Sequence, residues 1–107
     1  MLLSNTPELP GYTITQTIDL VAGNMVQSKH IGRDIMAGLK SIIGGEVVGY
    51  TEMLVEAREQ AVVRMISQAE DKGANAVINI RFTTSAIDTG MSELLAYGTA
   101  VIVEKES

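Results

Sequence analysis

The longest regular pattern in the sequence is that of residues 51–73, TEMLVEAREQAVVRMISQAEDKG. Apolar and small side chains recur there every three or four residues, which is typical of one face of an α-helix. This stripe consists of Leu54, Ala57, Ala61, Met65 and Ala69, widened by Met53, Val62 and Ile66. Thr51 can cap the start of the helix, and Gly73 can supply the left-handed residue that closes it. The pattern predicts a long amphipathic helix whose alanines let it lie close to a sheet.

Strand patterns stand on both sides of this helix. Residues 12–20 alternate between apolar and polar side chains, with Gln16 as an exception, and Gly23 and Asn24 would weaken or bulge the end of that strand. Residues 76–83 are rich in β-branched side chains, residues 84–92 are expected to form a polar loop, and residues 94–103 a last strand.

Two further segments complete the predicted layout. Residues 1–11, with two prolines and a glycine, are expected to form a short tail. Apolar residues at helical spacing in 35–43, followed by Gly44 and Gly45, predict a second, short helix. The prediction is a single α+β domain over residues 1–107, of β-α-α-β-β order, with the long helix packed on a small three-stranded sheet.

The last predicted strand is apolar on both faces. Leu94, Ala96, Ala100 and Ile102 would lie on one face, and Leu95, Tyr97, Val101 and Val103 on the other. A strand buried on both faces needs two covering layers. Two helices cannot readily supply both in so small a domain, so we expect another subunit to cover one face.

Composition excludes several classes of function. The chain has 107 residues, a net charge of −5 and no cysteine. An acidic protein lacks the basic surface that binds nucleic acid or anionic lipid. The start of the chain lacks the features of a signal peptide, and no apolar run approaches the roughly 20 residues of a membrane-spanning helix. We expect a cytoplasmic protein that binds neither nucleic acid nor membranes.

Metal binding depends on few available ligands. His30 is the single histidine, and transition-metal sites usually need three or four nitrogen or sulfur ligands. Copies of His30 around an oligomer axis could supply them, as could His30 with Asp34 or with Glu52 and Glu56. The alternative is that Glu52 and Glu56 form a solvated acidic first turn of the helix. Met53 and Met65 are interpreted as core packing rather than as thioether ligands.

Other polar residues are candidates for binding a ligand or a neighbouring subunit, and no nucleophile–base pair indicates an enzyme. Arg58 has no acid three or four residues away on its helix, which favours an ion pair with a neighbouring subunit. The candidate ligand-binding residues are Arg33, Asp34, Glu46, Tyr50, Glu52 and Arg58. The segment Asp88-Thr89-Gly90 matches the tripeptide of aspartic proteases, but with 17 residues after it, it is interpreted as a hairpin loop.

Several short motifs together resemble the YbjQ-like family. They are Ile31-Gly32-Arg33-Asp34-Ile35, Gly38-Leu39-Lys40, Gly44-Gly45-Glu46, Tyr50-Thr51-Glu52-Met53-Leu54, Ala57-Arg58, Gly73-Ala74-Asn75-Ala76-Val77 and Ala96-Tyr97-Gly98-Thr99-Ala100-Val101. These small bacterial and archaeal proteins have no established function and are often labelled heavy-metal-binding. The resemblance implies a subunit related in shape to dodecin-like folds and assembled as a ring, a pentamer.

The sequence and the resemblance lead to one hypothesis and one alternative. The hypothesis is a homo-oligomeric binding protein without enzymatic activity, whose heavy-metal binding is implied by the resemblance alone. The alternative is a ring that holds a small organic ligand or cofactor at its subunit interfaces. The sequence identifies no particular cofactor.

Overall fold

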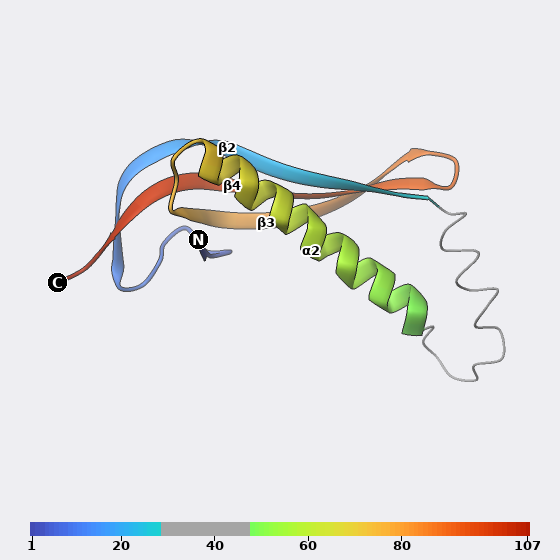
Figure 1. Cartoon of the computed structure of the whole chain (residues 1–107), viewed down its shortest axis with the longest axis horizontal. Coiled ribbons are helices and arrows are strands. Elements are labelled where there is room, and N and C mark those ends of the chain that lie inside the picture. Colours follow the sequence, from blue (N-terminus) through green and yellow to red (C-terminus); the bar gives the residue numbers. More distant parts are fainter. Residues whose placement is uncertain (29–47) are drawn as a thin grey trace.

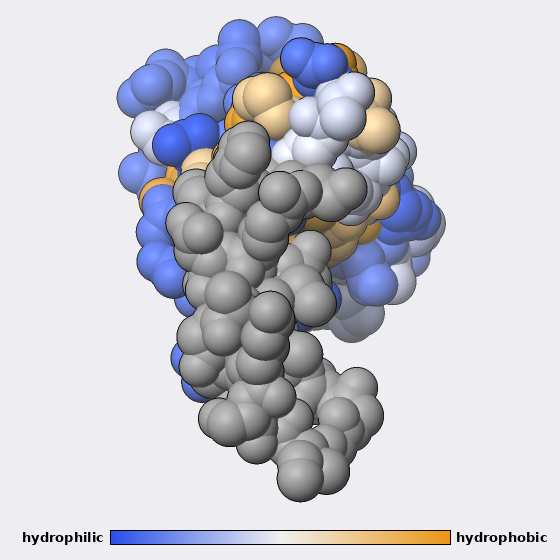
Figure 2. Space-filling model, turned by 90° about the vertical axis from the view of Figure 1, so that its right-hand side faces the viewer, coloured by the Kyte–Doolittle hydropathy of each residue, from blue (hydrophilic) through white to orange (hydrophobic). Residues whose placement is uncertain are grey.

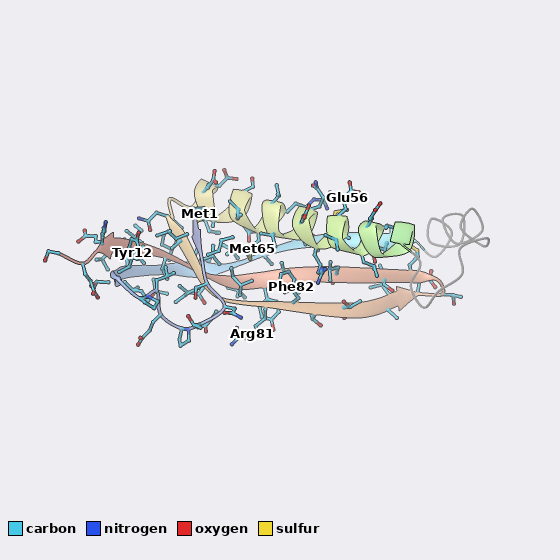
Figure 3. All side chains as sticks on the ribbon, turned by 90° about the horizontal axis from the view of Figure 1, so that it is seen from below. Met1, Tyr12, Glu56, Met65, Arg81 and Phe82 are labelled. Atoms are coloured by element: carbon cyan, nitrogen blue, oxygen red, sulfur yellow. The ribbon has the colours of Figure 1, made fainter. Side chains whose placement is uncertain are left out.

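The computed structural model describes residues 1–28 and 48–107, which form one helix packed on a four-stranded mixed sheet. The elements are β1 (Leu2–Leu3), β2 (Tyr12–Ser28), α2 (Val48–Asp71), β3 (Ala76–Asp88) and β4 (Met91–Lys105). Figure 1 shows α2 crossing the long strands, and Figure 3 shows that it lies on one face of the sheet. The predicted α+β class is therefore confirmed. The short helix predicted within 35–43 lies outside the described residues.

The sheet has four strands rather than the three predicted, in the order β1-β3-β4-β2. The fourth strand comes from the predicted tail, where Leu2 and Leu3 pair in parallel with Ala76 and Val77. Both β2 and β3 pair antiparallel with β4, so they run parallel to each other with β4 between them. Two residues of regular pairing carry almost no periodic signal, which is why β1 escaped prediction.

The helix begins one turn earlier than its sequence suggests. It starts at Val48, so Thr51 lies inside it and Glu52 and Glu56 lie beyond its first turn, which holds no acidic residue. The predicted cap and the acidic first turn are therefore wrong. The end agrees with prediction: Gly73 has a φ of 86°, and its N–H donates to the carbonyl of Glu70 while that of Ala74 donates to Ala69.

Most of the core lies between α2 and the sheet. Ala57, Ala61, Met65 and Ala69 are buried as the stripe predicted, whereas Leu54 is partly exposed. The fully buried side chains facing the helix include Val21 on β2 and Val77 on β3. Within the described residues, no helix has the length and hydropathy needed to cross a bilayer.

Gly23 is the point of closest approach between α2 and β2. A Cβ atom at this position would lie 2.1 Å from the carbonyl oxygen of Ala61 and 2.4 Å from the backbone nitrogen of Met65. The expectation that Gly23 weakens the strand end is wrong, because β2 continues to Ser28. The glycine instead leaves room for the helix backbone.

The bulges of β2 occur earlier, and they change which face its apolar residues occupy. The pairing with β4 shifts between Ile14 and Gln16 and again between Thr17 and Asp19. Tyr12 and Ile14 consequently pack in a second cluster, while Ile18 packs against the core under the helix. The simple alternation predicted for residues 12–20 therefore does not place all its apolar residues on one side.

The second cluster lies at the end of the sheet that holds both termini. It contains Ala76, Ile78, Val101 and Val103, and Leu9 from the N-terminal segment packs against it. Asn75 stabilises this end, because its side chain donates to the carbonyl of Val103 at 2.9 Å and accepts from the N–H of Val103 at 2.8 Å. The N-terminal segment thus covers part of the sheet that was expected to need another subunit.

Strands β3 and β4 form a long hairpin instead of enclosing a polar loop over 84–92. Pairing continues to Asp88 and Met91, which leaves Thr89 and Gly90 as the turn. Gly90 has a φ of 75°, and the N–H of Thr89 donates to the carboxylate of Asp88 at 2.7 Å. Asp88-Thr89-Gly90 is thus part of a hairpin turn, as its turn-forming residues predicted.

Candidate functional site

Helix α2 is flanked by a hollow on one side and a groove on the other. The hollow, about 150 Å³ in volume, lies between the N-terminal half of α2 and the end of β2. Its lining includes Met25, Gln27, Met53, Glu56, Ala57 and Gln60. Two thioethers, two amides and a carboxylate therefore border one small space.

Helical spacing accounts for this arrangement. Met53, Glu56, Ala57 and Gln60 lie three or four residues apart, so they share the side of α2 that overhangs β2. On the strand, Met25 packs against the core under the helix, and Gln27, two residues further, points to the same face. Glu56 is exposed and lies on the solvent side of the helix in Figure 3, at the rim of the hollow.

The groove lies on the opposite flank of α2, above β3. It is lined by Val55, Arg58, Glu59, Val62, Val63 and Phe82, with a volume of about 550 Å³. Val63 is 55% exposed and Phe82 is 49% exposed. The pairing of Phe82 with Ala96, a core residue under the helix, places Phe82 on the helix side of the sheet.

The free edge of β2 is bound to α2 by side chains rather than by another strand. The N–H of Ala22 donates to the side-chain carbonyl of Gln68 at 2.7 Å, and Arg64 donates to the carbonyl of Asn24 at 2.6 Å. These bonds occupy backbone groups that would otherwise be free to pair with another strand.

One ion pair occurs among the described residues, between Lys72 and Asp19 at 3.0 Å. The hydrogen bond from Lys72 lowers the pKa of Asp19, and the backbone N–H of Leu20 and the positive charge of Lys72 lower it further. Both side chains are exposed to solvent. The pair joins the end of α2 to β2 and lies away from the hollow and the groove.

The predicted site residues whose side chains the structure describes all lie on α2. Glu56 borders the hollow, Arg58 borders the groove, and Glu52 is exposed one turn before Glu56. Four predicted residues, His30, Arg33, Asp34 and Glu46, lie outside the described residues, as does the side chain of Tyr50. The structure therefore does not test the predicted cluster as a whole.

Sequence reasoning did not identify Met25 or Gln27 as candidates. Met65 is a core residue, as predicted, but Met53 is only half-buried and lines the hollow. The predicted alternation covered residues 12–20, whereas β2 continues to Ser28. Met25 and Gln27 lie two residues apart in this continuation, and that spacing was the one signal that they share a face of the strand.

The described residues do not form a metal site of the common type. Within residues 1–28 and 48–107, no group of three or more histidine, cysteine, aspartate or glutamate residues lies close enough to hold an ion. Methionine is not among these four residue types, although its thioether sulfur can also ligate a metal ion. Both Met25 and Met53, whose thioether sulfurs are suited to a soft metal ion, line the hollow.

Comparison with known proteins gives consistent results. A YbjQ family model described as "Putative heavy-metal-binding" matches residues 1–104. A UPF0145 protein from Psychromonas ingrahamii is 60% identical over 105 residues, covering 98% of this chain and 100% of the relative. Another, from Vibrio parahaemolyticus, is 59% identical over 101 residues, covering 94% of this chain and 96% of the relative.

A solved structure has a similar fold. It is that of a protein of unknown function of the DUF74 family from Pediococcus pentosaceus, with a TM-score of 0.64 and 15% sequence identity. The match covers 97% of this chain and 98% of the other. At this identity the likeness establishes a shared fold.

Proposed function

The chain belongs to the YbjQ family, and from this premise we propose that it acts as a cytoplasmic homo-oligomeric protein that binds a heavy metal ion. The family description supports the metal, and the exposed apolar surfaces described below support the oligomer. The proposal is one of binding without catalysis, because the sequence offers no nucleophile–base pair.

The observation that carries the oligomer is the exposed apolar surface on the sheet face that points away from α2. Val21, Gly23 and Met25 face the helix, so the alternate residues of β2 face away from it. On that far face Leu20, which pairs with Thr99, is 65% exposed. Tyr97, which pairs with Ala22, and Leu95, which pairs with Asn24, follow it along the same face. The N-terminal segment bonds to residues 77–81 of β3, which β4 separates from β2, so it lies at the opposite edge of the sheet from Leu20.

The shape of the chain agrees with a subunit that needs neighbours. The radius of gyration of its Cα atoms is 17.3 Å, whereas a compact domain of about 100 residues has roughly 13 Å. Figure 2 shows hydrophobic residues among hydrophilic ones on the described surface that this view leaves visible. A thin, elongated subunit buries less of its own apolar surface and gains more by association.

Two different apolar surfaces favour a ring over a two-fold dimer. One is the far face of the sheet around Leu20 and Tyr97; the other is the groove beside α2 with Val63 and Phe82. When unlike surfaces meet, subunits join head to tail, and a closed set of such contacts is a ring. We propose a pentamer, as the family resemblance implies.

Mass measurement tests the assembly. Native mass spectrometry should give close to five times the subunit mass of 11.4 kDa. Leu20→Glu places a charge on the far face of the sheet, where it is solvated in one subunit but buried in the ring, so it should release smaller species. Ser67→Glu, an exposed change on α2 outside the groove, should keep the wild-type mass. A wild-type mass of 11.4 kDa at micromolar concentration contradicts the proposal.

Metal binding needs a separate test. We expect elemental analysis of protein dialysed against zinc, copper and silver salts to show an ion bound per subunit or per ring. A tight zinc site requires several subunits, because each chain has one histidine and no cysteine. His30→Ala should then abolish zinc binding. Tight zinc binding that persists in His30→Ala would show that zinc uses other ligands.

A second candidate function is the binding of a small organic molecule between subunits. The groove favours it, since about 550 Å³ and the exposed ring of Phe82 suit such a ligand. Purified protein should then release a small molecule on denaturation, detectable by absorbance and mass spectrometry. Protein that releases none, while binding metal, favours the first proposal.

A further inference from the structure

The hollow between α2 and β2 has the donor atoms of a soft-metal site. Met25 lines it from the strand and Met53 from the helix, so two thioether side chains border it from two different elements. A thioether is a soft, uncharged ligand that selects monovalent copper and similar ions over zinc, calcium or magnesium. Two aliphatic side chains would pack in this space equally well. They would lack the lone pairs with which a sulfur atom coordinates a metal ion.

Oxygen and nitrogen donors complete the lining. The carboxylate of Glu56 stands at the rim, where its negative charge attracts a cation. Gln27 lines the wall, and its Nε2 atom is buried without a hydrogen-bond partner among the described residues. Rotation of the terminal amide by 180° exchanges Nε2 with the carbonyl oxygen Oε1, and this oxygen can ligate a metal ion. A buried polar group in need of a partner is unusual for simple core packing.

The size of the hollow favours an ion over an organic ligand. Pockets that hold drug-sized molecules or cofactors measure roughly 300–1,000 Å³, whereas this space measures about 150 Å³. The groove on the other flank of α2 is large enough for an organic ligand but contains no sulfur among its lining residues. The two sides of the helix therefore suit different occupants.

We propose that Met25 and Met53 ligate a soft monovalent ion, Cu⁺ or Ag⁺, in this hollow, with the Glu56 carboxylate and the Gln27 amide as hard donors at its edge. This inference rests on the proposed metal-binding function and names the ion class and a site within one subunit. It requires no histidine and no contribution from a neighbouring chain, so it is separable from both the zinc site and the oligomer.

The test follows the methionine methyl groups directly. The chain contains six methionines, which give six resonances in protein labelled with ¹³C-methyl methionine. Titration with Ag⁺, which is diamagnetic and stays monovalent in air, should shift the signals of Met25 and Met53 and leave that of the core residue Met65 in place. Substitution of each methionine by leucine assigns the signals.

Affinity is measured with Cu⁺ under anaerobic conditions, in competition with a chromogenic chelator. Met25→Leu and Met53→Leu conserve side-chain volume, so the fold should persist while each removes one sulfur and weakens binding. Their combination should abolish it. Met91→Leu makes the same change at an exposed methionine on the β4 end of the hairpin and should bind as the wild type does.

The outcomes separate the inference from the function on which it rests. Cu⁺ and Ag⁺ binding that survives the double substitution overturns the methionine site, and so does binding of zinc alone. Protein that binds no metal of any kind overturns the site and the metal-binding function together. A wild-type mass for both leucine variants shows that any loss of binding comes from the missing sulfurs rather than from dissociation of the oligomer.

Discussion

Gly23 determines how closely α2 lies on the sheet. The positions of Ala61 and Met65 leave no room for a Cβ atom at residue 23, because the nearest obstacles are backbone atoms that cannot rotate away. A side chain here would push the helix off β2 along its whole contact. The residue is therefore required by packing, although its φ angle is not in the left-handed region.

Gly23→Ala should destabilise the protein strongly. Overpacking by one methyl group in a rigid core costs about 1–3 kcal/mol, and the 2.1 Å approach to Ala61 places this site at or beyond the upper end. Urea unfolding followed by circular dichroism measures the loss. Thr83→Ala, an exposed change on β3, should alter the free energy of unfolding by less than about 0.5 kcal/mol. Equal stability of the two variants would contradict the close approach.

At the level of elements, the Lys72–Asp19 pair makes the contact between α2 and β2 depend on pH. The pKa of Asp19 is lower in the folded protein than in the unfolded chain, because the folded state places Lys72 beside it. The carboxylate therefore stabilises the fold above the unfolded pKa, and this contribution disappears as the pH falls through the folded pKa.

Asp19→Asn should lower the unfolding temperature slightly near neutral pH and have no effect once Asp19 is protonated. The effect is small because both side chains are exposed and salt screens them. Thermal unfolding of the variant and the wild type, followed from neutral pH down to about pH 2, reveals the convergence. A difference that remains constant over this range would mean that the ion pair does not contribute.

The helix was the element most accurately predicted, because four of its stripe residues are buried and its glycine end has the expected geometry. The start of the helix was predicted wrongly, because threonine occurs inside helices as well as at their N-caps. The strands were underestimated because bulges in β2 disturb its alternation and because exposed, polar strand residues such as Thr84 and Ser85 resemble a loop. The hollow was invisible in the sequence, because Met25 and Met53 are far apart in it and meet only through packing.

Ala61→Leu tests the packing of α2 on the sheet. Ala61 is fully buried and its backbone touches Gly23, so three extra carbon atoms have no space and should cost on the order of 1–3 kcal/mol. Ser67→Leu enlarges an exposed side chain of the same helix and should change stability by less than about 0.5 kcal/mol. Chemical denaturation compares them, and a tolerated Ala61→Leu would place the stripe on the wrong side of the helix.

For the whole molecule, the arrangement of apolar surface matters more than its amount. The far face of the sheet and the flank of α2 lie on opposite sides of a thin, two-layered chain, as Figure 3 shows for the helix and the sheet. A contact between unlike surfaces leaves one of each free on every pair of subunits, so association continues until the chain of contacts closes.

Mixing two variants distinguishes this head-to-tail contact from a symmetric one. Leu20→Glu disables the far face of the sheet, and Val63→Glu disables the flank of α2; both residues are mostly exposed in one subunit, so each variant should fold. In a head-to-tail assembly each variant alone should be monomeric, because every contact needs both surfaces. Mixed together, they retain one intact surface each and should form a heterodimer of twice 11.4 kDa, unable to grow further. A symmetric contact through the sheet would instead let the Val63→Glu variant dimerise alone. Light scattering of each variant and of their mixture distinguishes the head-to-tail contact from the symmetric one.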